Sequence, residues 1–90
     1  MRCRLIVSGR VQGVCYRFRC RDVALGLGLR GFVRNRPDGT VEVVAEGDKT
    51  GLDKLIEWCK KGPPAASVED VRIKMERKNE FSEFSIQAGH

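Results

Sequence analysis

The chain has 90 residues, of which 41% are hydrophobic and 32% are charged, and its formal net charge is +5. This length predicts one domain, residues 1–90, and the composition is typical of a folded globular protein rather than a disordered one. No apolar run approaches the ~20 residues that a membrane-spanning helix needs, and the first ten residues lack the features of a signal peptide. We therefore expect a cytoplasmic protein with no membrane partner.

The positive charge is concentrated in the first part of the chain. Residues 1–36 contain nine arginines, no lysine and one acidic residue, a charge of +8, whereas residues 37–90 contain eight basic and eleven acidic residues, a charge of −3. Guanidinium groups suit bidentate binding of phosphate or carboxylate, and such a positive field attracts anionic partners. For most of these arginines, however, we favour the interpretation as a solvated basic face.

A strand and a helix open the chain. Every second residue from Cys3 through Leu5 to Val7 is apolar, which predicts a strand with one face inward. From Tyr16 the apolar residues recur at helical spacing, and this stripe predicts an amphipathic helix. Gly28 fits as the stop signal of that helix.

A β-hairpin comes next. Residues 31–35 and 41–46 have the composition of strands, and RPDGT at 36–40 lies between them. This segment predicts a tight turn, because its proline presets φ and Gly39 can take a positive φ without steric cost.

The remainder of the chain predicts a helix and two strands. The second helix has its N-cap within residues 48–51 and ends at GPP, residues 62–64. Strands then cover residues 71–75 and 81–86. The order β-α-β-β-α-β-β predicts an α+β fold, a ferredoxin-like two-layer sandwich with a mostly antiparallel sheet and two helices on one face.

The cysteines and the histidine do not indicate a metal site. Cys3, Cys15, Cys20 and Cys59 form no CxxC pair, and the one histidine is His90. We therefore expect no bound metal and no cofactor. With no sign of secretion, we interpret the first, third and fourth cysteines as small core residues.

The segment GRVQGVCYR, residues 9–17, joins the first strand to the first helix. The N–H groups at the start of a helix have no intrahelical partner and lie at the positive end of its dipole, so they attract phosphate. Gly9 and Gly13 permit backbone angles that turn successive N–H groups toward one point, over which Arg17 can place its guanidinium. The spacing alone fits a plain turn with a surface arginine equally well.

Asn35 ends the strand that follows the first helix. Its amide can donate and accept hydrogen bonds, so it can hold a water molecule in a fixed direction. In a sandwich of this order the strand can lie near the first loop. Taken alone, Asn35 fits the start of the turn at 36–40 better.

Together, VSGRVQGVCYR at 7–17 and GFVRNRPDGTVEVVAEG at 31–47 resemble the two signature segments of the acylphosphatase family. The resemblance covers nearly all of the chain. It implies a ferredoxin-like fold and hydrolysis of the carboxyl–phosphate bond of an acyl phosphate, without a metal, to a carboxylate and inorganic phosphate. The family's catalytic arginine falls on Arg17 and its water-positioning asparagine falls on Asn35.

We expect the backbone N–H groups of the first loop to bind the phosphoryl oxygens, together with the arginine guanidinium. The phosphate-binding loop predicted in this way consists of Gln12, Gly13, Val14, Cys15, Tyr16 and Arg17. The chain departs from commoner family members at the fourth and fifth of these positions, but it keeps both catalytic groups.

A cysteine phosphatase is one competing interpretation, because Cys15 to Arg21 satisfies the pattern C-x5-R. The side chains between these two residues are bulky, whereas such a loop needs small ones. Tyr16 and Cys20 also belong to the apolar stripe of the helix. We interpret Cys15 as a bystander.

The alternative function is an RNA- or anion-binding ferredoxin-like module without catalytic activity. RGFV at 30–33 starts like an RNA-binding motif, but Val33 and Arg34 stand where that motif has a small residue and an aromatic one. We therefore expect a monomeric enzyme that acts on a small acyl phosphate and has no nucleic-acid partner.

Overall fold

A computed structural model of the protein describes residues 1–88, so His90 lies outside the described residues. The elements follow in the order predicted from the sequence. They are β1 (Arg2–Arg10), α1 (Tyr16–Gly26), β2 (Arg30–Asn35), β3 (Val41–Glu46), α2 (Lys49–Lys61), β4 (Ser67–Glu76) and β5 (Phe84–Gln87).

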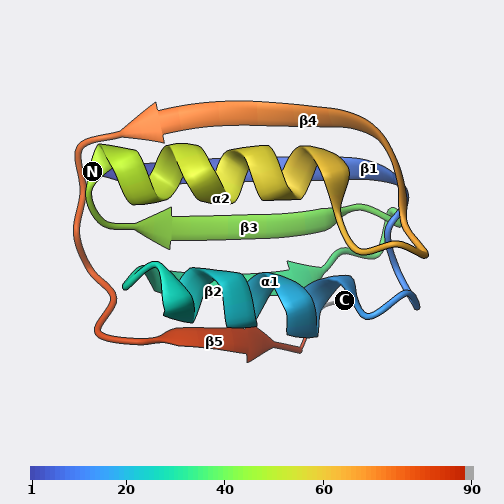
Figure 1. Ribbon diagram of the computed structural model, residues 1–90, viewed down its shortest axis with the longest axis horizontal. Coiled ribbons are helices and arrows are strands. Elements are labelled where there is room, and N and C mark those ends of the chain that lie inside the picture. Colours follow the sequence, from blue (N-terminus) through green and yellow to red (C-terminus); the bar gives the residue numbers. More distant parts are fainter. Residues whose placement is uncertain (89–90) are drawn as a thin grey trace.

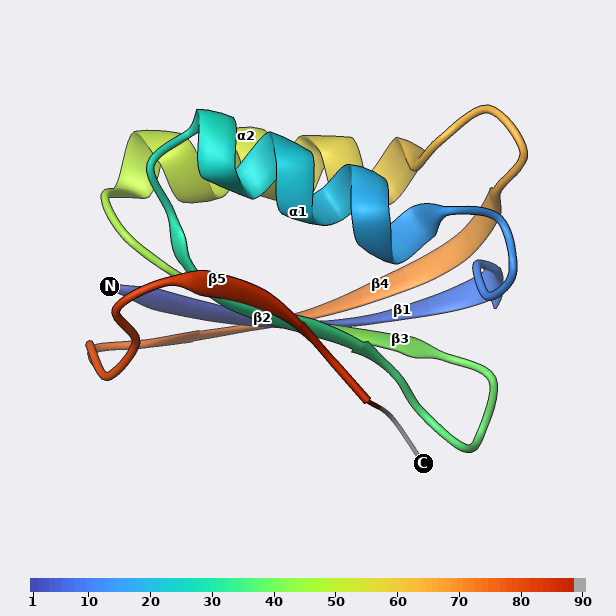
Figure 2. The ribbon, with the colours of Figure 1, turned by 90° about the horizontal axis from the view of Figure 1, so that it is seen from below.

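The strands form one five-stranded sheet in the order β4-β1-β3-β2-β5. The pair β2–β5 is parallel, and the other three pairs are antiparallel. Both helices cover the same face of the sheet, with α1 over β2 and β5 and α2 over β1 and β4 (Figure 2). This arrangement confirms the predicted ferredoxin-like α+β sandwich.

The core lies between the helices and the sheet. Leu5, Val33 and Val43 from the sheet and Leu52 and Leu55 from α2 are fully buried there. The three cysteines expected in the core are buried too, and Cys15 is exposed, as their positions on the stripes predict. Among the described residues, neither helix combines the length and the apolar character that crossing a membrane requires.

Capping and turn residues set the ends of the elements. The Asp48 carboxylate caps α2 by accepting a hydrogen bond from Gly51 N–H at 3.1 Å, which confirms a cap within residues 48–51. At its other end Gly62, with φ +70°, terminates α2. Gly39 has φ +90° in the turn between β2 and β3, as the sequence predicts.

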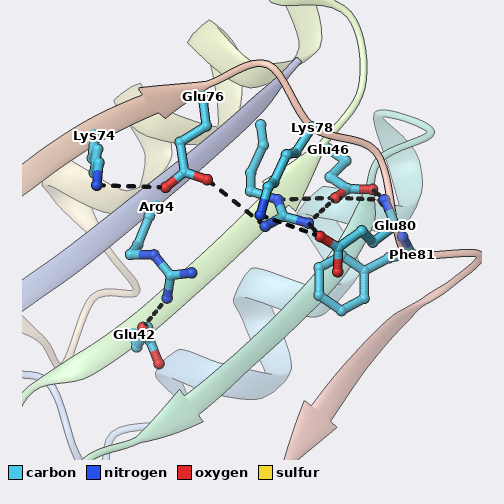
Figure 3. Close-up of polar contacts among 9 residues, drawn as sticks. Arg4, Glu42, Glu46, Lys74, Glu76, Lys78, Glu80 and Phe81 are labelled. Atoms are coloured by element: carbon cyan, nitrogen blue, oxygen red, sulfur yellow. Dashed lines mark hydrogen bonds and ion pairs between the residues drawn. The ribbon is translucent and has the colours of Figure 1, made fainter.

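The opposite face of the sheet carries a network of ion pairs (Figure 3). All six residues of β3 are buried, so this strand is covered on both faces rather than on one. The Glu46 carboxylate accepts hydrogen bonds from the Arg2 side chain at 2.6 and 2.9 Å, and Glu42 pairs with both Arg4 and Arg34.

The last strand starts later than predicted, at residue 84 instead of residue 81. The N–H groups of Glu80 and Phe81 donate to the Glu46 carboxylate, so a side chain holds the first part of this segment. The neighbouring strand β2 binds it at Glu83, whose carbonyl oxygen accepts from Gly31 N–H. The Phe81 ring packs edge-on against Phe32, with 5.6 Å between ring centroids. The alternation of apolar residues in the sequence could not show that the buried Glu46 carboxylate would bind these N–H groups.

The two ends of the sheet carry different connections (Figure 1). The N-terminus, the end of β3 and the loop between β4 and β5 lie at one end. The loop between β1 and α1, the start of α1 and the turn between β2 and β3 lie at the other (Figures 1 and 2). The sequence segments that resemble the family signatures therefore meet at one end.

Candidate active site

The loop between β1 and α1 starts at a point where the backbone of two strands comes very close. The register of β1 against β4 shifts between Ser8 and Gly9, and Gly9 has φ +117°. A Cβ atom on Gly9 would lie 2.2 Å from the carbonyl oxygen of Ser67, so only glycine fits there. This close approach fixes where the loop leaves the sheet.

The same loop ends in an uncapped helix. Cys15, the residue before α1, has the left-handed φ of 62°, and its side chain forms no capping hydrogen bond. In the part of the chain that the structure describes, the N–H groups of residues 12–18 have no hydrogen-bond acceptor. These donors are accordingly available to an anion at the positive end of the helix dipole.

A cavity of about 260 Å³ opens at this end of α1. Its lining residues are Val11, Gly13, Cys15, Tyr16, Arg17, Phe18 and Asn35. Arg17 is partly exposed, and no carboxylate of residues 1–88 lies within ion-pair distance of it. Its guanidinium is therefore a cation that the fold leaves unneutralised beside a row of N–H donors.

Asn35 reaches the same cavity from the end of β2. Its Oδ1 atom is buried and accepts no hydrogen bond from any described residue. Leaving a buried polar atom unpaired costs about 1–3 kcal/mol, which folded proteins seldom tolerate without a functional reason. The structure thus brings Arg17 and Asn35, which are 18 positions apart in the sequence, to one cavity.

Gln12 connects the loop to the turn that follows Asn35. Its side-chain amide donates hydrogen bonds to the carbonyl oxygens of Arg36 at 2.8 Å and Thr40 at 2.9 Å. Gln12 does not line the cavity. These two bonds hold the loop against the end of β2, so they set the separation between the N–H groups and Asn35.

The other predicted loop residues face in different directions. Val14 packs against the core and Cys15 is exposed. Tyr16 is buried, and its hydroxyl donates to the Cys59 carbonyl oxygen at 2.7 Å. Burial raises the pKa of Tyr16, so its phenol stays neutral. Its hydroxyl is bound to the Cys59 carbonyl oxygen and is not available to a ligand in the cavity. From Val14 and Tyr16 only backbone groups are therefore suitable ligands.

Sequence reasoning missed two lining residues, Val11 and Phe18. Val11 is 1% exposed and belongs to the core, whereas Phe18 is 52% exposed. An aromatic residue outside the apolar stripe of the first helix was the available signal for Phe18.

A larger hollow of about 620 Å³ lies elsewhere, between the outer sides of the two helices and the loop after α2. Trp58, Pro63 and Pro64 line it together with Arg19 and Lys61. Its lining contains neither Arg17 nor Asn35, and it includes an acidic side chain, Asp22, beside the two cations. The smaller cavity has the chemistry of an anion site, so we take it as the candidate active site.

The lining of the smaller cavity includes no acidic side chain and no histidine among the described residues. Across residues 1–88 no three cysteine, aspartate, glutamate or histidine side chains gather closely enough to hold a metal ion. The chemical resources of the site are therefore N–H donors, one guanidinium and one carboxamide. These groups suit the binding of a tetrahedral oxyanion and the orientation of a water molecule.

The curated relatives at about 50% identity to this chain are acylphosphatases. The acylphosphatase family model matches residues 3–86. The chain is 54% identical over 83 residues to the acylphosphatase of Acaryochloris marina, which covers 92% of this chain and 89% of that protein. It is 51% identical over 86 residues to the acylphosphatase of Pelotomaculum thermopropionicum, which covers 94% of both.

Solved structures agree with the sequence comparisons. The crystal structure of acylphosphatase from Bacillus subtilis has a TM-score of 0.93 and 40% identity, covering 96% of this chain and 97% of that one. An acylphosphatase from Coxiella burnetii has a TM-score of 0.91 and 37% identity, covering 96% of this chain and 90% of that one. The chain belongs to the acylphosphatase family, the enzymes that hydrolyse acyl phosphates.

Proposed function

We propose the following mechanism by which this chain hydrolyses the carboxyl–phosphate bond of an acyl phosphate. The phosphoryl group lies at the start of α1, where backbone N–H groups within residues 12–18 donate to its oxygens and the Arg17 guanidinium adds a bidentate contact. The available donors of the uncapped helix, next to an unpaired cation, support this position. The Gln12 side chain supports the site from outside by binding the turn at Arg36 and Thr40.

Asn35 aims the attacking water. Asn35 lines the cavity, so its carboxamide can hold a water molecule against the phosphorus, and its Oδ1 is not bound by any described residue. The water oxygen forms a bond to phosphorus while the bond from phosphorus to the carboxyl oxygen breaks. A phosphoryl oxygen of the substrate takes the water proton, and the products are a carboxylate and inorganic phosphate.

The reaction needs no strong acid, because the leaving carboxylate is a weak base. Catalysis then consists of positioning and of stabilising the charge on the phosphoryl oxygens. Arg17 and the N–H groups supply that positive charge, so we propose that the enzyme needs neither metal nor cofactor. The unpaired Oδ1 of Asn35 beside the Arg17 cavity is the single observation that carries this mechanism.

Partner and location are further parts of the proposal. We propose that residues 1–90 act as one monomeric domain on a small acyl phosphate, with no nucleic-acid partner. RNA-binding modules of this fold type stack bases on aromatic residues of the open sheet face. Here the aromatic residues of that face, Phe32 and Phe81, pack against each other. The arginines Arg2, Arg4 and Arg34 on the same face are bound by carboxylates. Four free thiols suit the reducing cytoplasm, where we propose that the enzyme works.

Kinetics of Arg17→Ala and Asn35→Ala with benzoyl phosphate, in excess chelator, test the mechanism. Removing one preorganised donor of this kind lowers turnover by about 10²–10³. We expect Arg17→Ala to lose at least that much, with effects on both kcat and KM, and Asn35→Ala to lower kcat more than KM. Asn35→Ala should keep its thermal stability, because the Oδ1 makes no hydrogen bond in the described structure.

Arg19→Ala is the matched control. It removes the same charge from the same helix, but Arg19 lines the larger hollow and not the candidate active site. Its kinetics should stay within about twofold of the wild type, since surface charge acts weakly through solvent. Wild-type turnover in both Arg17→Ala and Asn35→Ala would refute the mechanism.

A further inference from the structure

Phe18 is a large apolar side chain that the fold leaves in solvent beside the active-site cavity. It is 52% exposed, although it lines the same cavity as Arg17 and Asn35. The other two large apolar lining residues, Val11 and Tyr16, are each 1% exposed and belong to the core. Within the described lining, Phe18 is therefore the apolar side chain that a bound molecule can still cover.

The position of Phe18 directs its ring toward the cavity mouth. It is the third residue of α1, and helical side chains lean toward the N-terminus of their helix, which here is the phosphate-binding end. The Arg21 guanidinium, one turn further along, stands 5.5 Å from the ring centroid. This cation–π contact restrains the ring from the side away from the cavity.

The chemistry of the substrate determines which part of it contacts the Phe18 ring. In the proposed function the phosphoryl group occupies the N–H donors and Arg17, so the acyl group is the part that extends beyond them to the mouth. The walls there offer no acidic side chain and no histidine in the described structure. An apolar or aromatic acyl group gains from covering the ring, whereas an acetyl group has only a methyl to offer.

We propose that Phe18 is the contact platform for the acyl group and a specificity-determining residue that favours aromatic and extended apolar acyl phosphates over acetyl phosphate. This proposal rests on the proposed function. The contact lies outside the reacting bonds, so it strengthens binding in the ground state and the transition state alike. Its loss therefore raises KM and leaves kcat nearly unchanged.

The test compares Phe18→Ala with the wild type on benzoyl phosphate and acetyl phosphate. An aromatic contact of this kind corresponds to a change of about 3–10-fold. We expect KM for benzoyl phosphate to rise by about that factor, with a clearly smaller rise for acetyl phosphate. Phe18→Leu keeps an apolar contact, so its KM for benzoyl phosphate should lie between those of the wild type and Phe18→Ala.

Leu25→Ala is the matched control, because Leu25 lies on the same helix, is 54% exposed and does not line the cavity. It should leave the ratio of the two kcat/KM values unchanged. Arg21→Gln releases the ring and should lower that ratio by less than Phe18→Ala does.

Two outcomes overturn the acyl platform: an unchanged KM for benzoyl phosphate in Phe18→Ala, or an equal loss on both substrates. The proposed mechanism fails in a different way, through wild-type kinetics in Arg17→Ala. If Arg17→Ala is inactive and Phe18→Ala keeps the wild-type substrate ratio, only the platform is refuted.

Discussion

At one end of the sheet the Glu46 carboxylate is fully buried, and Arg2 together with the N–H groups of Glu80 and Phe81 donates hydrogen bonds to it. At the other end the Asn35 Oδ1 is buried and accepts no hydrogen bond from a described residue. Both groups are polar and both lie out of water. In the proposed function their hydrogen bonds differ because the first group stabilises the fold and the second belongs to the residue that positions the attacking water.

The two helix starts show the same contrast. Asp48 caps α2 with its carboxylate, whereas α1 has no side-chain cap. Cys15, before α1, instead takes a left-handed φ that disfavours a side chain. An acidic cap at this place would repel a phosphate. The comparison indicates that stability is lower at the proposed anion site than at the opposite end of the sheet.

Glu46→Ala should give the largest effect on this comparison. Removing one partner of a buried ion pair costs about 3–5 kcal/mol, and we expect the lower limit because Glu76 and Glu80 stay close to Arg2. Urea unfolding measures the loss. Activity per folded molecule should stay near the wild-type value, since Glu46 is the last residue of β3, and β3 ends at the opposite end of the sheet from the start of α1 and the candidate active site (Figure 1).

Glu57→Ala, at an exposed pair on α2, is the control and should change stability by less than about 0.5 kcal/mol. A Glu46→Ala enzyme that keeps its stability but loses kcat would break the comparison, because the two ends would then not be separate.

Acid should produce a smaller loss at the same end. Burial raises the pKa of Glu46, but hydrogen bonds from Phe81 N–H, Arg2 and Glu80 N–H lower it by a larger amount. The net pKa therefore lies below the ordinary 4.5. The unfolded chain then binds more protons than the folded one as the pH falls below about 4.5. The associated stability is complete above that pH and is lost as the pH drops through the folded pKa.

Glu42 adds to this effect: burial raises its pKa, and the guanidinium groups of Arg34 and Arg4 lower it by more. Urea unfolding between pH 7 and pH 3 measures the decline in the free energy of unfolding. Glu46→Gln should flatten the decline, because its amide does not titrate. A decline as steep in Glu46→Gln as in the wild type would show that other carboxylates control acid unfolding.

Cys15→Gly should give the smallest effect, and it should be a gain. A left-handed φ costs a residue with a side chain about 1–2 kcal/mol, and glycine removes this cost. The greater conformational entropy of glycine in the unfolded chain offsets about 0.4–1 kcal/mol of the gain. We expect a net stabilisation of roughly 0.5–1 kcal/mol in thermal or urea unfolding. Cys15→Ala keeps the strained φ and should show no such gain.

The same two variants examine the cysteine phosphatase interpretation. Cys15 is exposed and lines the cavity, but the proposed mechanism gives its thiol no part. Hydrolysis of benzoyl phosphate should therefore persist in both variants. Loss of activity in a folded Cys15→Ala protein would assign the chemistry to the thiol and overturn the proposed mechanism.

Local patterns determined most of the fold. Periodicity placed both helices and the hairpin, because an amphipathic stripe and an alternating strand each leave a direct trace in the sequence. Glycines marked the turn at 39 and the end of α2 at 62, where only a residue without a side chain takes the positive φ easily. The two signature segments pointed to Arg17 and Asn35 as candidate site residues, and the structure brings both to one cavity.

Other features were decided by tertiary contacts. Nothing local shows that Gln12 binds the carbonyl oxygens of Arg36 and Thr40, since its partners lie 24 and 28 positions away. The late start of β5 and the burial of Glu46 depend on each other, because the N–H groups before β5 donate hydrogen bonds to the Glu46 carboxylate. The sequence determined which segments become helices and strands, because those choices depend on neighbours in the chain. Which polar groups find partners and which stay open for a substrate depends on long-range packing, so only the folded chain could decide it.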